Sequence, residues 1–256
     1  MIEVKNVSKQ FDGREILKDV SFKMYKGKNN LIIGASGSGK TVMIKCMIGL
    51  FRPEKGQILY DGIDLVTMEE EELKEIRMQI GMLFQGSALF DSMTVMENIM
   101  FPLNMFTKDS YAKKVRRVSQ VLEEVELKDA GKKYPAEISG GMKKRVALAR
   151  AIVLFPKYLF CDEPNSGLDP QTSLVIDHLI NRLTKEYDMT TIINTHDMNT
   201  VMESGDNIIY LHQGKKQWEG SNKEIVNSDD QLLNDFIFAS DFFKSAKVAQ
   251  IEKNKQ

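Results

Sequence analysis

Apolar and polar residues alternate in the first part of the chain, which is the pattern of strands with one buried face. Two sets of residues follow this spacing of two: Ile2, Val4 and Val7, then Val20, Phe22 and Met24. A short buried strand is predicted at 30–33 and a helix at 42–50. The pair Asp61-Gly62 is typical of a two-residue turn, so residues 58–60 and 63–65 should form a hairpin.

The apolar spacing becomes helical after residue 69. A run of four glutamates opens a predicted helix at 69–77, and no strand pattern appears from 86 to 155. Thr94 and Glu97 have the spacing of a capping box, which predicts that a helix begins there. A second helix is indicated by Val115, Val118, Val121, Leu122 and Val125. A third helix should begin near Ser139.

Strands return in the last third of the chain. Apolar segments at 158–161, 191–194 and 207–211 alternate with helical segments, which is typical of a parallel sheet. Beyond residue 228 an apolar stripe is formed by Leu232, Leu233, Phe236 and Ile237, with Phe242 and Phe243 further on. Such a stripe is unfavourable in water, so it must cover either the chain's own core or another subunit.

Composition excludes several classes of protein. The chain has 256 residues, of which 42% are apolar and 28% charged, so a disordered protein is excluded. The chain has 35 Lys and Arg and 36 Asp and Glu. It therefore lacks the excess of positive charge that would indicate a nucleic-acid partner. No apolar run reaches the roughly 18 residues of a membrane span, and the first residues lack a signal-peptide pattern. We therefore expect any membrane role to come through a partner, and we expect Cys46 and Cys161 to be buried and reduced.

Residues 34–41 read Gly-Ala-Ser-Gly-Ser-Gly-Lys-Thr, the phosphate-loop pattern. Glycines let the backbone turn its N–H groups towards phosphate oxygens, and the next helix adds about half a positive charge at its start. Lys40 should pair with the β- and γ-phosphates, and Thr41 should ligate Mg²⁺. The residues expected to bind the nucleotide here are Gly34, Ala35, Ser36, Gly37, Ser38, Gly39, Lys40, Thr41 and Val42.

A second candidate element is the pair Asp162-Glu163, which ends an apolar strand. Asp162 is expected to hold Mg²⁺, and Glu163 should polarise the attacking water as a general base. Alone, two acids after a strand are more typical of a helix cap. The phosphate loop elsewhere in the chain favours the catalytic interpretation.

The segment Ser139-Gly140-Gly141-Met142 opens a predicted helix, with Ser139 as its N-cap, and is a second candidate anion site. Together with Ser166-Gly-Leu-Asp169 and Asn194-Thr-His196-Asp, these motifs occur in the order found in ABC ATPases. From residue 1 to about 225 the chain resembles that family. The resemblance implies a P-loop NTPase of α/β class, with a parallel-sheet core, an antiparallel β flank and a helical subdomain.

The resemblance also implies roles for single residues. Gln85 would join the Mg²⁺ site, Phe11 would stack on adenine, and His196 would contact the γ-phosphate. Asp169 would cross a dimer, and Ser139, Gly140, Gly141 and Met142 would contact the nucleotide of the other subunit. Without the family, His196 could be a structural histidine, Gln85 an ordinary strand-end amide and Phe11 a core aromatic.

An assembly follows from the same resemblance. The catalytic core would comprise 1–85 and 156–227, the signature subdomain 86–155, and a C-terminal extension 228–256. Two copies would bind ATP between them and drive a separate integral membrane permease from the cytoplasmic side of the inner membrane.

Three residues depart from the commonest family pattern, namely Ile138, Met142 and Asn165. The segments 84–91 and 139–151 are similar to the ATPases of Mla-like, Mce-type transporters, which move phospholipids or related lipids between bacterial membranes. This similarity implies an Mce-type lipid-binding protein and a small accessory subunit as partners, and a C-terminal segment that crosses the dimer. The alternatives are another importer, a lipoprotein-release system and a cell-division signalling ATPase.

Methionines gather around Gln85, at positions 78, 82, 93, 96, 100 and 105. Three of them, Met93, Met96 and Met100, should share one helical face. They either fill the core or form an adaptable surface for a helix of a membrane partner.

Overall fold

A computed structural model describes residues 1–239 of the chain, which fall into two compact units. The first unit contains 1–25, 29–68 and the described residues from 194 onward, and the second contains 26–28 and 69–193. The helical segment predicted at 86–155 therefore lies wholly inside the second unit.

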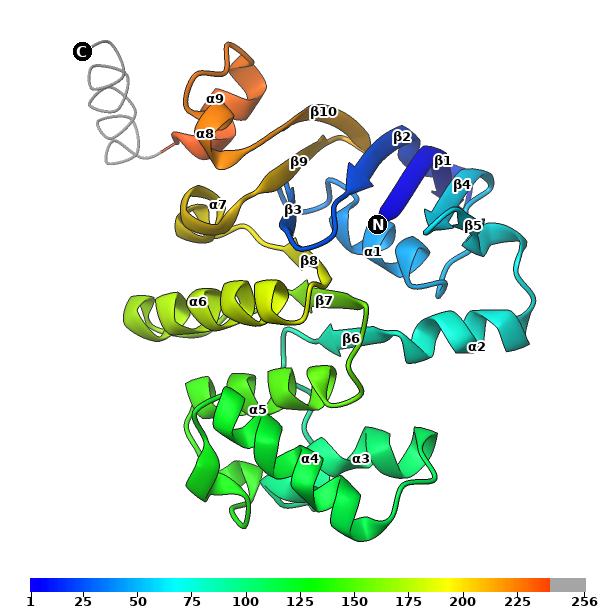
Figure 1. Ribbon diagram of the computed structural model, residues 1–256. Coiled ribbons are helices and arrows are strands. Elements are labelled where there is room, and N and C mark those ends of the chain that lie inside the picture. Colours follow the sequence, from blue (N-terminus) through cyan, green and yellow to red (C-terminus); the bar gives the residue numbers. More distant parts are fainter. Residues whose placement is uncertain (240–256) are drawn as a thin grey trace. The chain divides into compact units, whose positions relative to one another are not determined.

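The first unit contains an antiparallel sheet with the strand order β2-β1-β4-β5 (Figure 1). It also contains the run β10-β9-β3, in which β3 is parallel to β9. Its strands are β1 (Ile2–Phe11), β2 (Arg14–Met24), β3 (Asn29–Ile33), β4 (Lys55–Tyr60), β5 (Ile63–Asp64), β9 (Asn207–His212) and β10 (Lys215–Gly220). Its helices are α1 (Lys40–Met47), the 3-10 helix Leu65–Thr67, α7 (Met198–Ser204), α8 (Asn222–Ile225) and α9 (Gln231–Ile237).

Particular residues explain two connections in this unit, the β4–β5 turn and the contact of α1 with β4. Asp61 and Gly62 both have positive φ, 49° and 92°, and join β4 to β5, so the predicted hairpin is confirmed. Helix α1 is tied to β4 by Tyr60, whose buried hydroxyl donates to the carbonyl oxygen of Met47 at 2.6 Å. The helix begins earlier than the apolar spacing predicted, because the phosphate loop leads directly into it at Lys40, and it ends earlier, ahead of Gly49, which has φ of 71°.

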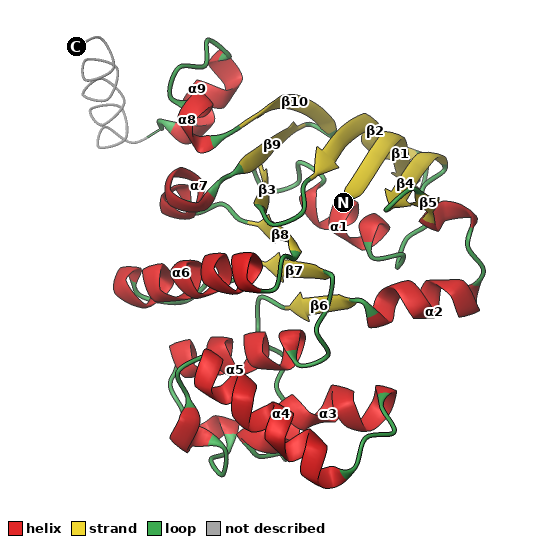
Figure 2. Cartoon of the chain, in the orientation of Figure 1, coloured by secondary structure: helices red, strands yellow, loops and turns green. Residues whose placement is uncertain are grey.

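The second unit combines strands in the order β8-β7-β6, of which β6 and β7 are parallel, with several helices (Figure 2). Its strands are β6 (Ile80–Leu83), β7 (Tyr158–Asp162) and β8 (Thr190–Asn194). Its helices are α2 (Glu70–Met78), α3 (Val95–Phe106), α4 (Tyr111–Glu124), the 3-10 helices Lys128–Ala130 and Pro135–Glu137, α5 (Gly140–Ile152) and α6 (Pro170–Glu186). The capping box at Thr94 and the N-cap at Ser139 are both confirmed.

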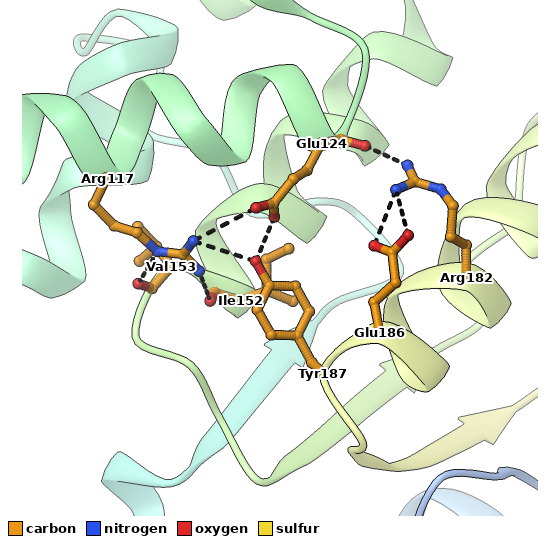
Figure 3. A network of polar contacts seen from close by, with 7 residues as sticks. All are labelled: Arg117, Glu124, Ile152, Val153, Arg182, Glu186 and Tyr187. Atoms are coloured by element: carbon orange, nitrogen blue, oxygen red, sulfur yellow. Dashed lines mark hydrogen bonds and ion pairs between the residues drawn. The ribbon is translucent and has the colours of Figure 1, made fainter.

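A buried polar network ties α4 to the end of α5 and to the residue after α6 (Figure 3). Arg117 donates to the carbonyl oxygens of Ile152 and Val153, both at 3.0 Å, and so caps the carbonyl end of α5. It also lies 3.6 Å from Glu124, and the hydroxyl of Tyr187 joins the two side chains. The packing of these helices therefore depends on a cation that the apolar pattern did not indicate.

For the part of the apolar stripe that lies in the described helix α9, the cover is the chain's own core; a C-terminal segment that crosses the dimer stays a prediction. Leu233 and Ile237 are buried within the chain itself, and the ring of Phe236 stacks on Tyr210 of β9 with 5.2 Å between centroids. Leu232 is the stripe member that stays exposed. Phe242, Phe243 and the rest of 240–256 lie outside the described residues. Both cysteines are free and buried, as predicted.

Candidate nucleotide-binding and hydrolysis site

The phosphate loop runs from β3 into α1 in a conformation that requires glycine. Gly34, Gly37 and Gly39 have φ of 149°, 78° and 105°. A Cβ on Gly34 would lie 2.3 Å from the carbonyl oxygen of Leu211 and 2.7 Å from the hydroxyl of Ser38. The glycines of the motif thus allow the positive backbone angles, and Gly34 also allows the close approach of neighbouring atoms, as the pattern predicted.

The polar groups of this loop suit an anionic ligand. Lys40 is buried, and its ammonium donates to the carbonyl oxygens of Gly34 and Ala35 at 2.7 and 3.1 Å. The buried hydroxyl of Ser38 has no hydrogen-bond partner among the described residues. A buried hydroxyl without a partner is costly, and a phosphate oxygen in the loop would supply one. Thr41 is exposed beside it at the start of α1.

His196 and Phe11 lie in the same unit as the loop. The segment carrying His196 is fixed to β3, because the amide of Thr195 donates to the carbonyl oxygen of Ile32 at 3.3 Å. His196 is exposed. Phe11 is 38% exposed and packs its ring edge to face on Phe51, 5.2 Å between centroids, so it is not a core residue. Stacking of Phe11 on adenine stays a prediction.

In the second unit, the structure brings Gln85 and Glu163 together. The side-chain amide of Gln85 donates to the carboxylate of Glu163 at 2.9 Å and to the hydroxyl of Ser166 at 3.2 Å. Asp162 ends β7, as predicted, and Glu163 follows it with φ of 47°, outside the extended conformation of the strand. The sequence motifs did not predict this amide–carboxylate bond.

The oxygen donors expected to hold Mg²⁺ suit that ion, because it prefers oxygen ligands. They are the hydroxyl of Thr41, the amide oxygen of Gln85 and the carboxylate of Asp162. The amide oxygen of Gln85 has no hydrogen bond within the described part of the chain. Among the residues that the structure describes, no three His, Cys, Asp or Glu side chains gather to hold a metal ion by themselves. The three ligands therefore stay a prediction.

The signature segment lies against the start of α6. Ser139 accepts a hydrogen bond from the amide of Met142, and Asp169 caps α6 through Thr172. Hydrogen bonds from Thr172 hold the pKa of Asp169 below its usual range. A Cβ on Gly141 would lie 2.5 Å from the methyl of Thr172, so this glycine is required for contact between the two segments.

Asn165 replaces the commonest residue of the family, and the structure gives it a partner. Its amide donates to the carboxylate of Asp177 at 2.9 Å, and both side chains are buried. A buried carboxylate needs such donors. The hydrogen bond of Asn165 thus stabilises the segment that follows Glu163.

An apolar groove of about 440 Å³ adjoins the loop after Gln85, within the second unit. Most of its lining residues are apolar, and two are arginines. The lining residues are Arg77, Met78, Ile80, Gly81, Met82, Phe84, Ala88, Phe90, Phe101, Pro102, Phe106, Arg150, Ala151, Leu154 and Pro156. Each of the two alternatives for the methionines therefore describes some of them. Met78 and Met82 line the groove, whereas Met100 is buried and Met93 and Met96 are not among the lining residues.

Comparison with known proteins gives a consistent result. Residues 17–166 match the ABC transporter family. The chain is 40% identical over 236 residues to the probable ribonucleotide transport ATP-binding protein mkl of Mycobacterium leprae, covering 92% of this chain and 68% of that protein. It is 40% identical to the methionine import ATP-binding protein MetN of Haemophilus ducreyi, covering 93% of this chain and 70% of that protein.

Two solved structures have the same fold. One is a dimeric post-hydrolysis state of the ATP-binding cassette MJ0796 bound to ADP and Pi, with a TM-score of 0.78 and 32% identity over 87% of this chain and 99% of that chain. The other is cbiO1 from Clostridium perfringens, part of the transporter complex cbiONQ, with a TM-score of 0.84 and 27% identity over 96% of this chain and 98% of that chain. No helix in the described part of our chain is long and apolar enough to cross a membrane. The chain belongs to the ABC transporter family, as an ATP-binding subunit that hydrolyses ATP with Mg²⁺.

Proposed function

We propose that this chain drives a transporter that moves phospholipids or related lipids between bacterial membranes. It would act on the cytoplasmic side of the inner membrane through a separate permease, with an Mce-type lipid-binding protein and a small accessory subunit. The observation that carries the transport function is the apolar groove beside the loop after Gln85. The lipid cargo rests on the similarity of segments 84–91 and 139–151 to Mce-type ATPases.

The groove has the character of a site for a partner helix. Its walls carry Phe84, Phe90 and Phe106, which are 40–45% exposed, an unusual exposure for large apolar side chains. Arg150 on one wall donates to the carbonyl oxygens of Ser87 and Ala88 at 2.8 Å, so the loop itself forms part of the groove. A permease helix bound there would contact the same loop that carries Gln85, which links transport to ATP hydrolysis.

Within the hydrolysis reaction, we assign Lys40 to the phosphates, Glu163 to the attacking water and His196 to the γ-phosphate. Mg²⁺ would neutralise charge that develops on the phosphates. Two copies would share each ATP, with the phosphate loop of one and Ser139, Gly140, Gly141 and Met142 of the other. The dimeric ADP-bound relative supports this arrangement.

Sharing of the sites can be tested by mixing two inactive chains. Lys40→Ala removes the phosphate ligand, and Ser139→Arg blocks the signature segment. A heterodimer of the two variants has one site with both lesions and one site with neither, so mixing should restore part of the ATPase activity. No recovery in a verified heterodimer would contradict the shared site.

The main alternative cargo is a small polar nutrient, because the curated relatives are named for methionine import and ribonucleotide transport. A cell-division signalling ATPase and a lipoprotein-release system would share the same motifs. The membrane partner distinguishes these functions, since each class has a different one.

The test is to purify the full chain with its membrane partners and reconstitute the complex in proteoliposomes. Labelled phospholipid should stimulate ATP hydrolysis and leave the donor vesicle, whereas methionine and a ribonucleotide should have no effect. Phe106→Asp in the groove should abolish copurification of the permease. Tyr111→Asp, which lies 71% exposed outside the groove, should not. Stimulation by methionine or the ribonucleotide alone would contradict the lipid cargo.

A further inference from the structure

Helix α5 carries a buried lysine that contacts no carboxylate directly. Lys144 is 4% exposed, and its ammonium donates to the backbone carbonyl oxygen of Gln85 in a short hydrogen bond. It donates more weakly to the carbonyl oxygen of Glu163, at 3.4 Å. One cation thus holds the main chain at two residues that lie 78 positions apart in the sequence.

The same two residues are joined through their side chains. Gln85 donates to the carboxylate of Glu163 at 2.9 Å. Lys144 therefore fixes the backbones from which the amide and the carboxylate extend, while the side chains bind each other. This arrangement defines the distance between the predicted Mg²⁺ ligand and the predicted general base without Lys144 approaching either reacting group.

The backbone around these residues is in conformations that need support. Glu163, Ser87 and Ala88 have φ of 47°, 62° and 49°, which non-glycine residues rarely adopt. Arg150, two turns along α5 from Lys144, holds the carbonyl oxygens of Ser87 and Ala88. Both ends of the loop after Gln85 are thus attached to α5 by cations.

Burial of this lysine is difficult to explain by stability alone. Burial lowers the pKa of Lys144, and the nearby Cys161, Glu163 and Asp162 oppose that shift. A buried charge whose hydrogen-bond acceptors are neutral carbonyls is costly, and an apolar side chain of similar length would often be at least as stable. A role in placing the groups that it holds would explain why a lysine lies buried here.

We propose that Lys144 is a positioning residue for ATP hydrolysis, which keeps Gln85 and Glu163 in the geometry that the reaction needs. This role concerns hydrolysis by the chain itself and is independent of the cargo. Loss of the ammonium would let the Gln85 loop and Glu163 move relative to each other, so the chemical step would slow while ATP binding at the phosphate loop would persist.

The test compares Lys144→Met with Lys144→Arg in the full-length chain. Lys144→Met keeps the apolar stem but cannot donate, so kcat should fall about 10- to 100-fold, the range expected for a lost hydrogen bond from a charged group. KM for ATP should change less than about threefold. Lys144→Arg should recover most of kcat. Lys185→Met, an exposed lysine on α6, should match the wild type.

A second measurement separates positioning from general destabilisation. In a Glu163→Gln background, Lys144→Met should lower the remaining hydrolysis less than about threefold, because the group through which it acts is already absent. If Lys144→Met fails to fold, Lys144→Leu, which also cannot donate a hydrogen bond, replaces it with the same expectations. A kcat within threefold of wild type, a rise in KM alone, or an equal loss in both backgrounds would overturn the proposal.

Discussion

Arg117 allows a quantitative test of how the second unit is held together. Replacement by Met keeps most of the apolar stem, but it removes the bonds to the carbonyl oxygens of Ile152 and Val153. The carbonyl of Val153 is then left buried without this donor, which costs about 1–3 kcal/mol, whereas the carbonyl of Ile152 keeps a hydrogen bond from the amide of Phe155 at 3.0 Å. The contact with Glu124 adds less, because that carboxylate is 18% exposed and partly screened by water.

With the lost hydrogen bond to Tyr187 and the lost contact with Glu124, Arg117→Met should lower the free energy of unfolding by about 2–4 kcal/mol. With a urea m-value of about 2 kcal/mol/M, the unfolding midpoint should fall by about 1–2 M. Far-UV circular dichroism measures this transition, because Arg117 contacts the end of helix α5.

The matched control is Arg116→Met, on the same helix at an exposed position. We expect it to change the free energy of unfolding by less than about 0.5 kcal/mol. Arg117→Lys should lie between the two, because one ammonium nitrogen would have to replace the three guanidinium nitrogens that donate to Ile152, Val153 and Tyr187. A loss of less than about 1 kcal/mol for Arg117→Met would refute the view that this cation caps α5.

Three further predictions follow from the site and the buried thiols. Glu163→Gln should reduce ATP hydrolysis about 10²–10⁴-fold with ATP affinity nearly unchanged in a binding titration, and hydrolysis within a few-fold of wild type would exclude this residue as the base. Gly34→Ala would force a Cβ to 2.3 Å from the carbonyl oxygen of Leu211, so ATP binding should be lost and the melting temperature should fall; normal ATP affinity would contradict this. Burial raises the pKa of Cys46 to about 12 and also raises that of Cys161, so at pH 8 both thiols are protonated and should react with a thiol reagent only after urea unfolding. Rapid reaction of the folded chain would show that one of them is accessible.

Features encoded in consecutive residues could be predicted from the sequence. The phosphate loop is one example. Its glycines indicate the unusual backbone angles and Lys40 supplies the charge, all within eight consecutive residues. The caps at Thr94 and Ser139 are others, since each acts on an amide only a few residues away. Strand and helix types followed from periodicity for the same reason.

Features that join distant residues could not be predicted. Lys144 follows the signature segment, and nothing in its neighbours indicates that it reaches the backbone of Gln85, 59 positions earlier. Helix α9 illustrates the other limit. The spacing of its apolar residues correctly predicted that Leu233 and Ile237 would be buried. Periodicity cannot identify the residues that bury them, which belong to the chain's own first unit.

The positions along α5 suggest why these distant contacts share one element. The helix begins at the proposed signature contact, holds Gln85 and Glu163 through Lys144 in its second turn, and reaches the groove wall at Arg150. Its end is capped by Arg117 from α4. A helix of 13 residues is a stiff rod of about 20 Å, so these contacts cannot shift independently. If the proposed roles of Gln85 and Glu163 hold, a partner that displaces the loop at Ser87 and Ala88 would act on their backbone through this helix, with Arg150 and Lys144 as the side chains that connect the two.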